Sequence, residues 1–370
     1  MYIHVLNIWC CTNDLTVNLE KSKIVHFRTQ SVSKSNFSFL FNGNNVDIVS
    51  QYTYLGLLFT EHLSYDNMAK AVAKAASRSL GLLISKCKAN GGFQYCTFTK
   101  LFDTLVWSVI DYGASIWGTR DFSCINSIKN RAMRFFMGVG KYTPNMSLYG
   151  DMGWMPCKIK QWTSVFRNWT RFNKMNDDRV NKKVFIWGNT CKKVKNWHFR
   201  VKNKFKELDM EYLCNGAILN KDLVKNIENV CFEKFKEEWY DKIMSDDKNK
   251  LRTYRMFKNV YGVENYLIFN IPGRYRSALA KFRCGVAPIR IETGRYENID
   301  IENRLCFNCT DDVEDEKHVL LNCPVYSDIR NVIFNHASIV DENFLHMSDN
   351  EKFIFLFTNE NMVFYTAKIC

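Results

Sequence analysis

The sequence has no uninterrupted apolar run of about 20 residues, the length that a membrane-spanning helix requires. Its first residues also lack the basic segment, the apolar segment and the small-residue cleavage site of an export signal. These absences argue against a membrane protein and against a secreted one. We therefore expect an intracellular protein, nuclear or cytoplasmic, with no membrane partner.

The motifs of several common enzyme classes are missing as well. There is no Gly-x-Ser-x-Gly elbow, no Walker loop for phosphates and no His-Glu-x-x-His. Adjacent aspartates occur at 177–178, 246–247 and 311–312, but each pair lies in polar sequence without apolar strands on both sides. A pair that held two metal ions for phosphoryl transfer would need such strands to aim both carboxylates at one point. The residues themselves therefore indicate no catalytic site.

Positive charge, in contrast, is abundant. Lys and Arg number 51 against 38 Asp and Glu, which gives a formal charge of +13. The chain is 46% hydrophobic and 15% aromatic, which is typical of a folded protein with packed cores. Such a charge favours a polyanionic partner, and RNA or DNA is the first to consider. The 14 cysteines are scattered through apolar contexts, as expected of reduced thiols inside a cell.

The hydrophobic pattern predicts an α+β protein that is mostly helical. A short helix over about residues 1–12 is followed by β-branched and aromatic runs, which we expect to form a small antiparallel sheet. The Asn42-Gly43-Asn44 step between two of these runs predicts a tight hairpin. Asp121 or Ser123 can cap one of the later helices, and Gly138 can end it. From residue 66 onward the period is helical, and helices are expected at 68–88, 97–110, 122–137 and 223–244.

Four residues of metal-ligating type cluster near the C-terminus. Cys306 and Cys309 have the Cys-x2-Cys spacing of a zinc knuckle, and His318 and Cys323 follow with eight and then four residues in between. Four such ligands would close a tetrahedron and leave no position for water, which is the pattern of a structural zinc. Ordinary buried thiols are the alternative. The acidic residues of 311–316 are expected to be solvated, because thiolates and imidazole would already satisfy the metal.

Whether this knuckle binds nucleic acid or is purely structural stays open, because zinc knuckles often contact RNA while the acidic loop opposes it. A clearer candidate surface is the row of Lys70, Lys74 and Arg78, which recur every four residues on one predicted helix. No acid occurs between Asp66 and Asp103, so pairing within the helix cannot neutralise them. A solvated helix face is the alternative for this row.

The second candidate surface is the stretch 181–206, which holds nine Lys or Arg, several aromatic residues and no acid. Cations there would contact the phosphate backbone while rings stack on unpaired bases. Trp187 and Trp197 could equally belong to a core. The candidate contact residues of this stretch are Lys182, Lys183, Lys192, Lys193, Lys195, Trp197 and Arg200.

Several segments resemble the reverse transcriptases of non-LTR (LINE-type) retrotransposons. Residues 9–23 are similar to the segment after the catalytic hairpin of that family, and 52–59, with Tyr54, Leu55 and Gly56, to its primer-grip strand. The matches frame residues 1 to about 330, while 150–270 matches only in its basic, aromatic character. The remaining similar segments are 111–118, Lys281-Phe282-Arg283, 291–296 and the cysteine cluster as far as Tyr326.

The resemblance implies a right-hand polymerase whose fingers, most of whose palm and both of whose catalytic carboxylate motifs would precede Met1. The Tyr/Phe-x-Asp-Asp hairpin of the family has no counterpart in this sequence. Lys21 matches a palm lysine that can protonate the departing pyrophosphate. We therefore expect the rear portion of a longer polymerase, inactive alone, which would use Mg²⁺ only together with the upstream part. That part would be a further partner besides RNA or DNA.

Two alternatives to the polymerase function are a stand-alone, zinc-dependent RNA- or DNA-binding protein derived from a retroelement, and an inert pseudogene product.

In terms of this family the chain divides into five expected regions. The five regions are a partial palm with primer-grip-like strands at 1–62, thumb-like helices at 63–150, a basic helical linker at 151–270, an Arg-rich segment with the zinc knuckle at 271–335 and a helical tail at 336–370.

Overall fold

The computed structural model describes residues 2–190, 196–215, 222–245, 250–310 and 312–370. Helices dominate and the strands are short, so the prediction of a mostly helical α+β protein is confirmed. The chain forms two compact units, 1–75 and 76–370, and each is described by itself. This division does not test the five predicted regions, which stay a prediction. Within the described residues no helix is long and apolar enough to cross a membrane.

The first unit contains α1 (Tyr2–Thr12) and six strands that pair two by two. The prediction of one antiparallel sheet was wrong, because the pairs stay separate in the described structure and one of them is parallel. Phe41 and Val46 are the buried strand residues of this unit, which is too little apolar surface to unite such short strands. The pairs are β1 (Ile24–Val25) with β4 (Ile48–Val49), β2 (Phe39–Phe41) with β3 (Asn44–Val46), and β5 (Gln51–Tyr54) with β6 (Leu57–Thr60).

Two of these pairs are hairpins with two-residue turns. Asn42 and Gly43, with φ of 48° and 77°, connect β2 to β3, so the predicted hairpin is confirmed. Leu55 and Gly56, with φ of 48° and 76°, connect β5 to β6 in the same way. Positive φ at both positions matches the right-handed twist of the strands. The three primer-grip-like residues are therefore exposed, with Tyr54 at the end of β5 and Leu55 and Gly56 in the turn, and their role stays a prediction.

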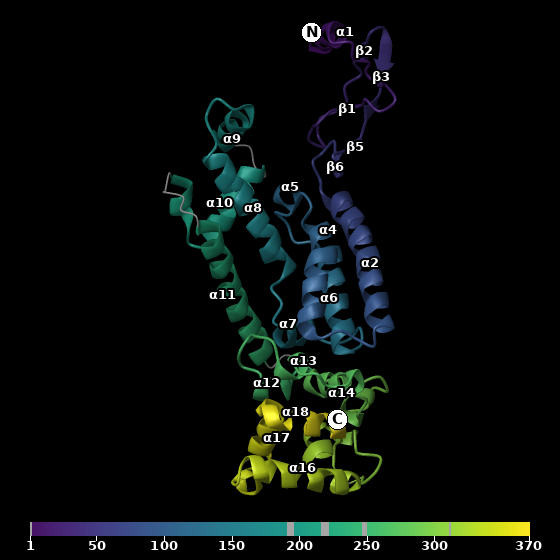
Figure 1. Cartoon of the computed structure of the whole chain (residues 1–370), viewed down its shortest axis with the longest axis vertical. Coiled ribbons are helices and arrows are strands. Elements are labelled where there is room, and N and C mark those ends of the chain that lie inside the picture. Colours follow the sequence, from purple (N-terminus) through teal and green to yellow (C-terminus); the bar gives the residue numbers. More distant parts are fainter. Residues whose placement is uncertain (1, 191–195, 216–221, 246–249, 311) are drawn as a thin grey trace. The chain divides into compact units, whose positions relative to one another are not determined.

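The long helix α2 (Asp66–Ala89) is amphipathic and matches the helix predicted at 68–88 (Figure 1). Asp66 lies in its first turn, where a carboxylate is favoured by the helix dipole. One face is buried and includes Val72, Ala76 and Leu80. The other face, which carries Lys70, Lys74 and Arg78, is exposed to solvent.

After the later part of α2, the second unit continues with a helical stretch from Tyr95 to Asp111, whose middle part is a π-helix. It corresponds to the helix predicted at 97–110. The helix predicted at 122–137 is also present, and Gly138 ends it with a φ of 71°. Neither predicted cap is used at its start, because Asp121 instead accepts from the side chain of Asn126 at 2.8 Å. The elements are α3 (Tyr95–Leu101), η1 (Phe102–Trp107), α4 (Ser108–Asp111), α5 (Ala114–Trp117), α6 (Ser123–Met137) and α7 (Asn145–Met152).

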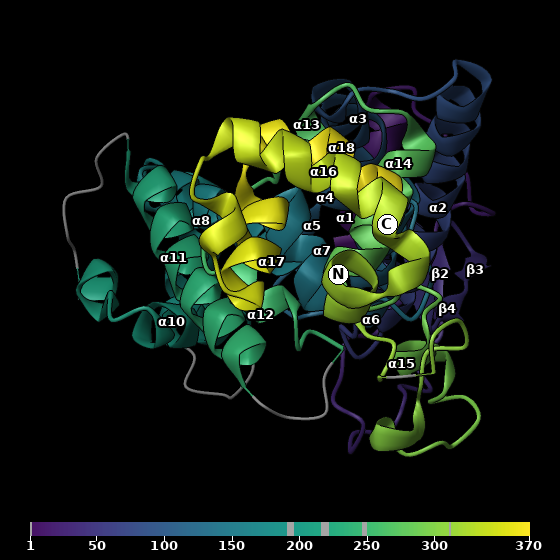
Figure 2. The same cartoon turned by 90° about the horizontal axis from the view of Figure 1, so that it is seen from below.

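The middle of the second unit is built on an aromatic core. Helices α8 (Cys157–Asn173) and α11 (Leu223–Met244) run side by side (Figures 1 and 2), and α11 has the predicted bounds. Between them in sequence are α9 (Val180–Thr190), α10 (Trp197–Glu207) and η2 (Glu211–Asn215). The rings and aliphatic side chains of these elements bury one another, including Trp162, Phe166, Trp169, Phe185, Phe205 and Ile227.

The C-terminal part is a set of short helices in which α14, α16 and α17 all contact α18 (Figure 2). Ser348 and Glu351 form a capping box that begins α17. The cysteines of the described residues are free thiols. The elements are α12 (Tyr254–Phe257), α13 (Asn265–Ile268), α14 (Gly273–Arg283), α15 (Arg290–Thr293), η3 (Ile301–Asn303), η4 (His318–Asn322), η5 (Pro324–Tyr326), α16 (Ser327–Val340), η6 (Phe344–His346), α17 (Asp349–Thr358), η7 (Glu360–Met362) and α18 (Val363–Ile369).

Candidate metal centre

A narrow loop between Leu305 and Val313, which pair in an antiparallel bridge, positions the first two predicted ligands. The backbone N–H of Cys306 donates to the carbonyl of Asp312 at 2.9 Å. The N–H of Thr310 turns back to the carbonyl of Cys306 at 2.9 Å, with Thr310 in the left-handed region at a φ of 59°. This tight reversal puts the side chains of Cys306 and Cys309 on the same side of the loop.

The second pair of ligands comes from a single helical turn. The N–H of His318 donates to the Asp315 carboxylate at 2.8 Å, which fixes the start of η4. The N–H of Cys323 then donates to the carbonyl of His318 at 2.7 Å, so the two side chains stand close together at the two ends of η4. A spacing with four intervening residues thus produces a pair that faces the loop of Cys306.

The four predicted ligands form one cluster in the structure. Their ligand atoms, from Cys306, Cys309, His318 and Cys323, all lie within 4.8 Å of one another. The sulfurs of Cys306 and Cys323 are 3.9 Å apart, and Cys309 Sγ is 3.3 Å from His318 Nε2. Zn–S bonds of about 2.3 Å in a tetrahedron would separate two sulfurs by about 3.8 Å. The cluster can therefore hold a metal ion, and its soft donor set suits Zn²⁺ better than Mg²⁺.

The cluster is shielded from water. Cys306 and Cys323 are fully buried and His318 is 4% exposed, while Cys309 is partly exposed. Burial, together with the neighbouring Cys306, raises the pKa of the Cys323 thiol. A cation at the centre would favour the thiolate form of Cys323, and metal binding would release protons. Nδ1 of His318 has no hydrogen-bond partner among the described residues, whereas zinc-binding histidines usually have one.

Two of the acidic residues around the cluster were expected to be solvated, and that prediction was wrong. Glu314 is buried because it accepts from the backbone N–H of Arg290 at 2.7 Å, and it lies 3.8 Å from Cys306 Sγ. Glu316 is buried because Arg252 donates to both of its oxygens at 2.8 Å. Both acids thus connect the metal loop to the rest of the second unit, through contacts that a local sequence pattern does not reveal.

The basic row of α2 is on the surface, as the sequence pattern predicts. Lys70, Lys74 and Arg78 are exposed, and within the described residues none has a carboxylate within ion-pair distance. Lys183 is exposed on α9. Lys21 is exposed in the turn before β1, where its carbonyl accepts from the Tyr52 hydroxyl at 2.6 Å, and its catalytic role stays a prediction.

Other predicted contact residues of 181–206 are engaged inside the protein. The ammonium of Lys182 is buried and donates to the carbonyls of Phe172 and Asn173, at 3.2 and 2.8 Å. The indole of Trp197 packs on the aromatic core and donates to the carbonyl of Ser115 at 2.9 Å. Arg200 donates to the hydroxyl of Thr119 at 3.0 Å. Packing and internal hydrogen bonds thus use these side chains, and their role in binding nucleic acid stays a prediction. Lys192, Lys193 and Lys195 lie outside the described residues.

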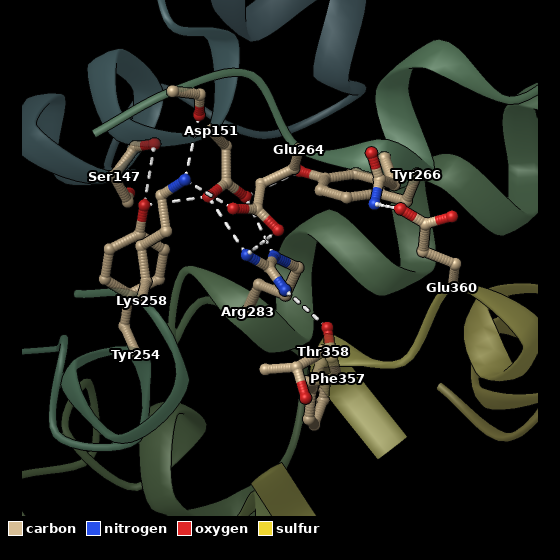
Figure 3. A network of polar contacts seen from close by, with 12 residues as sticks. Ser147, Asp151, Tyr254, Lys258, Glu264, Tyr266, Arg283, Phe357, Thr358 and Glu360 are labelled. Atoms are coloured by element: carbon tan, nitrogen blue, oxygen red, sulfur yellow. Dashed lines mark hydrogen bonds and ion pairs between the residues drawn. The ribbon is translucent and has the colours of Figure 1, made fainter. Parts of the chain in front are cut away.

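A second polar cluster, which the sequence pattern did not single out, surrounds Asp151 at the end of α7 (Figure 3). Its carboxylate is fully buried and accepts from the hydroxyls of Tyr254 and Tyr266, each at 2.8 Å. Arg283 from α14 donates to both carboxylate oxygens, at 3.0 and 3.3 Å. Burial would raise the pKa of Asp151, but Arg283 outweighs it and the pKa lies below its ordinary value. The aspartate is therefore an anion that accepts hydrogen bonds from three side chains, those of Tyr254, Tyr266 and Arg283.

Arg283 also extends this network to other elements. Its guanidinium pairs with Glu264 at 2.7 Å and donates to the Phe357 carbonyl at 3.2 Å (Figure 3). Glu264 in turn pairs with Lys258. Since every charge has an internal partner, this cluster joins α7, α13, α14 and α17 without requiring a ligand. An aspartate in the otherwise apolar stretch 146–155 was the signal that could have indicated it.

Comparison with known proteins adds no relative: no family model matches this chain, and no curated protein or solved structure is significantly similar to it.

Proposed function

We propose that this chain is a nucleic-acid-binding protein whose C-terminal part is stabilised by a structural Zn²⁺ on Cys306, Cys309, His318 and Cys323. Within that proposal it is the rear, template- and primer-binding portion of an RNA-directed DNA polymerase of the non-LTR retrotransposon type. The magnesium-binding carboxylates would then belong to a separate polymerase segment, so this chain would bind template and primer without extending the primer.

The exposed cations of α2 are the observation on which the binding function rests. Lys70, Lys74 and Arg78 follow one another at intervals of one helical turn, and no carboxylate of the described residues pairs with them. Three uncompensated charges along one helix match the regular spacing of backbone phosphates. An ordinary solvated helix would instead carry acids at i±4 positions, as α11 does.

The zinc would act on structure and not on chemistry. With four protein ligands the ion has no open position for a substrate or for water, and so cannot serve as a Lewis acid. Its effect is to hold the loop 305–313 against η4, and through Glu314 and Glu316 against the rest of the unit.

The binding function can be tested by replacing Lys70, Lys74 and Arg78 with Gln together. We expect weaker binding of a single-stranded RNA and a smaller dependence of affinity on salt, because three phosphate contacts would be lost. The slope of log K against log salt concentration should fall by roughly 2. Fluorescence anisotropy of a labelled RNA over a salt series measures this slope.

A matched control is available on α11. Lys234, Lys236 and Lys242 are each paired with a carboxylate, at 2.9, 2.8 and 3.9 Å, and replacing them with Gln removes the same total charge. This control should leave the slope nearly unchanged. Equal slopes for the parent and both triple variants would mean that the row on α2 does not contact phosphates.

A further inference from the structure

The second unit contains a cavity of about 320 Å³ near the metal loop, apart from the surfaces described above. The loop after α6, the end of α14 and the segment around α15 meet there. A volume of this size lies at the small end of ligand sites, where a single nucleotide fits and a helix does not. Its lining includes Tyr142, Lys281, Pro288, Glu292, Thr293 and Tyr296.

Two exposed tyrosines flank this cavity. Tyr142 and Tyr296 are 62% and 66% exposed, and their ring centroids are 6.5 Å apart with planes tilted by 51°. A base stacked between two parallel rings would need about twice the 3.4 Å spacing of stacked bases, or about 7 Å. The rings are therefore close to the separation that a base requires, and turning an exposed side chain to make them parallel is fast.

The charges around the tyrosines favour an anion. Lys141 lies over the Tyr142 ring at 4.7 Å, and Lys281 lines the cavity. In the described part of the chain neither lysine has a carboxylate within ion-pair distance. Among the residues that the structure describes, the one carboxylate that lines the cavity is Glu292, and it is already paired with Lys250 and Arg295. Two free ammonium groups thus stand beside two stacking rings.

The metal loop supports this cavity from behind. Glu314 accepts from the backbone N–H of Arg290, and its carbonyl accepts from the N–H of Ile291 at 3.0 Å. These bonds hold the first turn of α15, from which Glu292 and Thr293 enter the cavity lining. A metal that orders the loop 305–313 would therefore also order one wall of the cavity.

We propose that Tyr142 and Tyr296 form a stacking site for one unpaired base of a single-stranded nucleic acid, with its phosphates on Lys141 and Lys281. This site rests on the proposed nucleic-acid-binding function and makes it specific, since a base must be unpaired to enter between two rings. Aromatic rings next to free cations are the arrangement by which proteins hold single strands without reading sequence.

The test uses the full chain and an RNA strand of about 12 nucleotides with a fluorescent adenine analogue at its centre. The parent should quench the analogue, because its base stacks on a ring. Replacing Tyr142 and Tyr296 with Leu together should abolish the quenching and weaken binding about tenfold or more, with an unchanged salt slope. Replacing both with Phe should preserve both signals, because the ring faces remain.

Tyr212 and Tyr240, which are 58% and 44% exposed elsewhere in the unit, provide the matched Leu control and should behave like the parent. A Leu variant at Tyr142 and Tyr296 that binds and quenches like the parent would overturn this site but leave the proposed function intact. No binding of the strand by the parent chain would overturn the proposed function and the site with it. Circular dichroism and zinc content of each variant show that it is folded.

Discussion

The metal cluster and the Asp151 network both gather buried polar groups, but their charges are balanced differently. Around Asp151 one carboxylate meets an arginine and two tyrosine hydroxyls, so each donor finds an acceptor within the protein. At the metal cluster three thiols and an imidazole face one another, and the Cys306 thiol donates to the carboxylate of Glu314 at 3.8 Å. The metal cluster could hold a cation, whereas the Asp151 network already balances its own charges.

This difference separates a buried site that could hold a metal ion from one whose charges are already balanced. Both clusters contain residue types common in active sites. Each also has a buried acid, and Asp151 is more deeply buried than Glu314. The two kinds of site differ in whether their polar groups can pair with one another, because an unpaired buried charge costs far more free energy than a paired one. Three predictions test this contrast, and they are ordered by the size of the expected effect.

The largest effect is expected when one metal ligand is removed. Replacing Cys309 with Ser should weaken zinc binding on the order of 10⁴-fold, or about 5.4 kcal/mol, since even changes behind a ligand cost 10- to 100-fold. Because metal binding is coupled to folding, the region 300–330 should become sensitive to protease and exchange its amide hydrogens faster. Zinc content by elemental analysis and limited proteolysis measure the two consequences.

Cys96 is an exposed thiol outside the cluster and gives the control, Cys96→Ser, which should bind zinc like the parent. If Cys309→Ser keeps both its zinc content and the protease resistance of 300–330, the cluster is an ordinary group of buried thiols. The contrast with the Asp151 network would then disappear, because both clusters would be complete without a ligand.

A smaller but global effect is expected from Asp151→Asn. The change leaves Arg283 with less compensation and turns one acceptor oxygen into a donor that faces Tyr266 or Arg283. Breaking one side of a buried pair typically costs about 3–5 kcal/mol of the free energy of unfolding. Chemical denaturation followed by tryptophan fluorescence measures it, and the zinc content of the folded variant should equal that of the parent.

Asp241 on α11 is exposed and serves as the control, because Asp241→Asn should change the free energy of unfolding by no more than about 0.5 kcal/mol. A loss of zinc from folded Asp151→Asn would show that the two clusters are not independent. A cost as small as that of the control would show that the network contributes little to stability.

The two clusters also differ in how much of them the sequence predicts. The metal ligands lie within 18 residues, so their spacing alone indicated the site, and helical periods located α2, α6 and α11. Asp151 and Arg283 are 132 residues apart, and only tertiary packing pairs them. Counting basic residues likewise could not separate Lys70 from Lys182, because exposure depends on which carbonyls and rings pack nearby.

Lys129 on α6 is a third kind of buried polar group, with neutral partners only. It is 1% exposed, donates to the carbonyl of Met155, and lies over the rings of Trp107 and Trp154 at 5.8 and 5.5 Å. Burial lowers the pKa of Lys129 from 10.5 to about 8. Its charge is thus neither balanced by a carboxylate, as in the Asp151 network, nor in need of a ligand.

Lys129→Met should therefore differ from the parent in the pH dependence of stability. In the parent, Lys129 keeps its proton up to a pH near 10.5 when the chain is unfolded, but only up to about 8 when it is folded. The contribution of Lys129 to the free energy of unfolding therefore rises with pH between these two values. It is lost again as the pH falls through 8. The stability of Lys129→Met relative to the parent should accordingly decrease by roughly 3 kcal/mol from pH 8 to pH 10.5, because one pKa unit corresponds to 1.36 kcal/mol. Urea unfolding of both proteins across this range measures the difference, with exposed Lys183→Met as the control whose curve should stay parallel to that of the parent. Parallel curves for Lys129→Met and the parent would mean that Lys129 is as well solvated when folded as when unfolded, and that neutral partners can balance a buried charge.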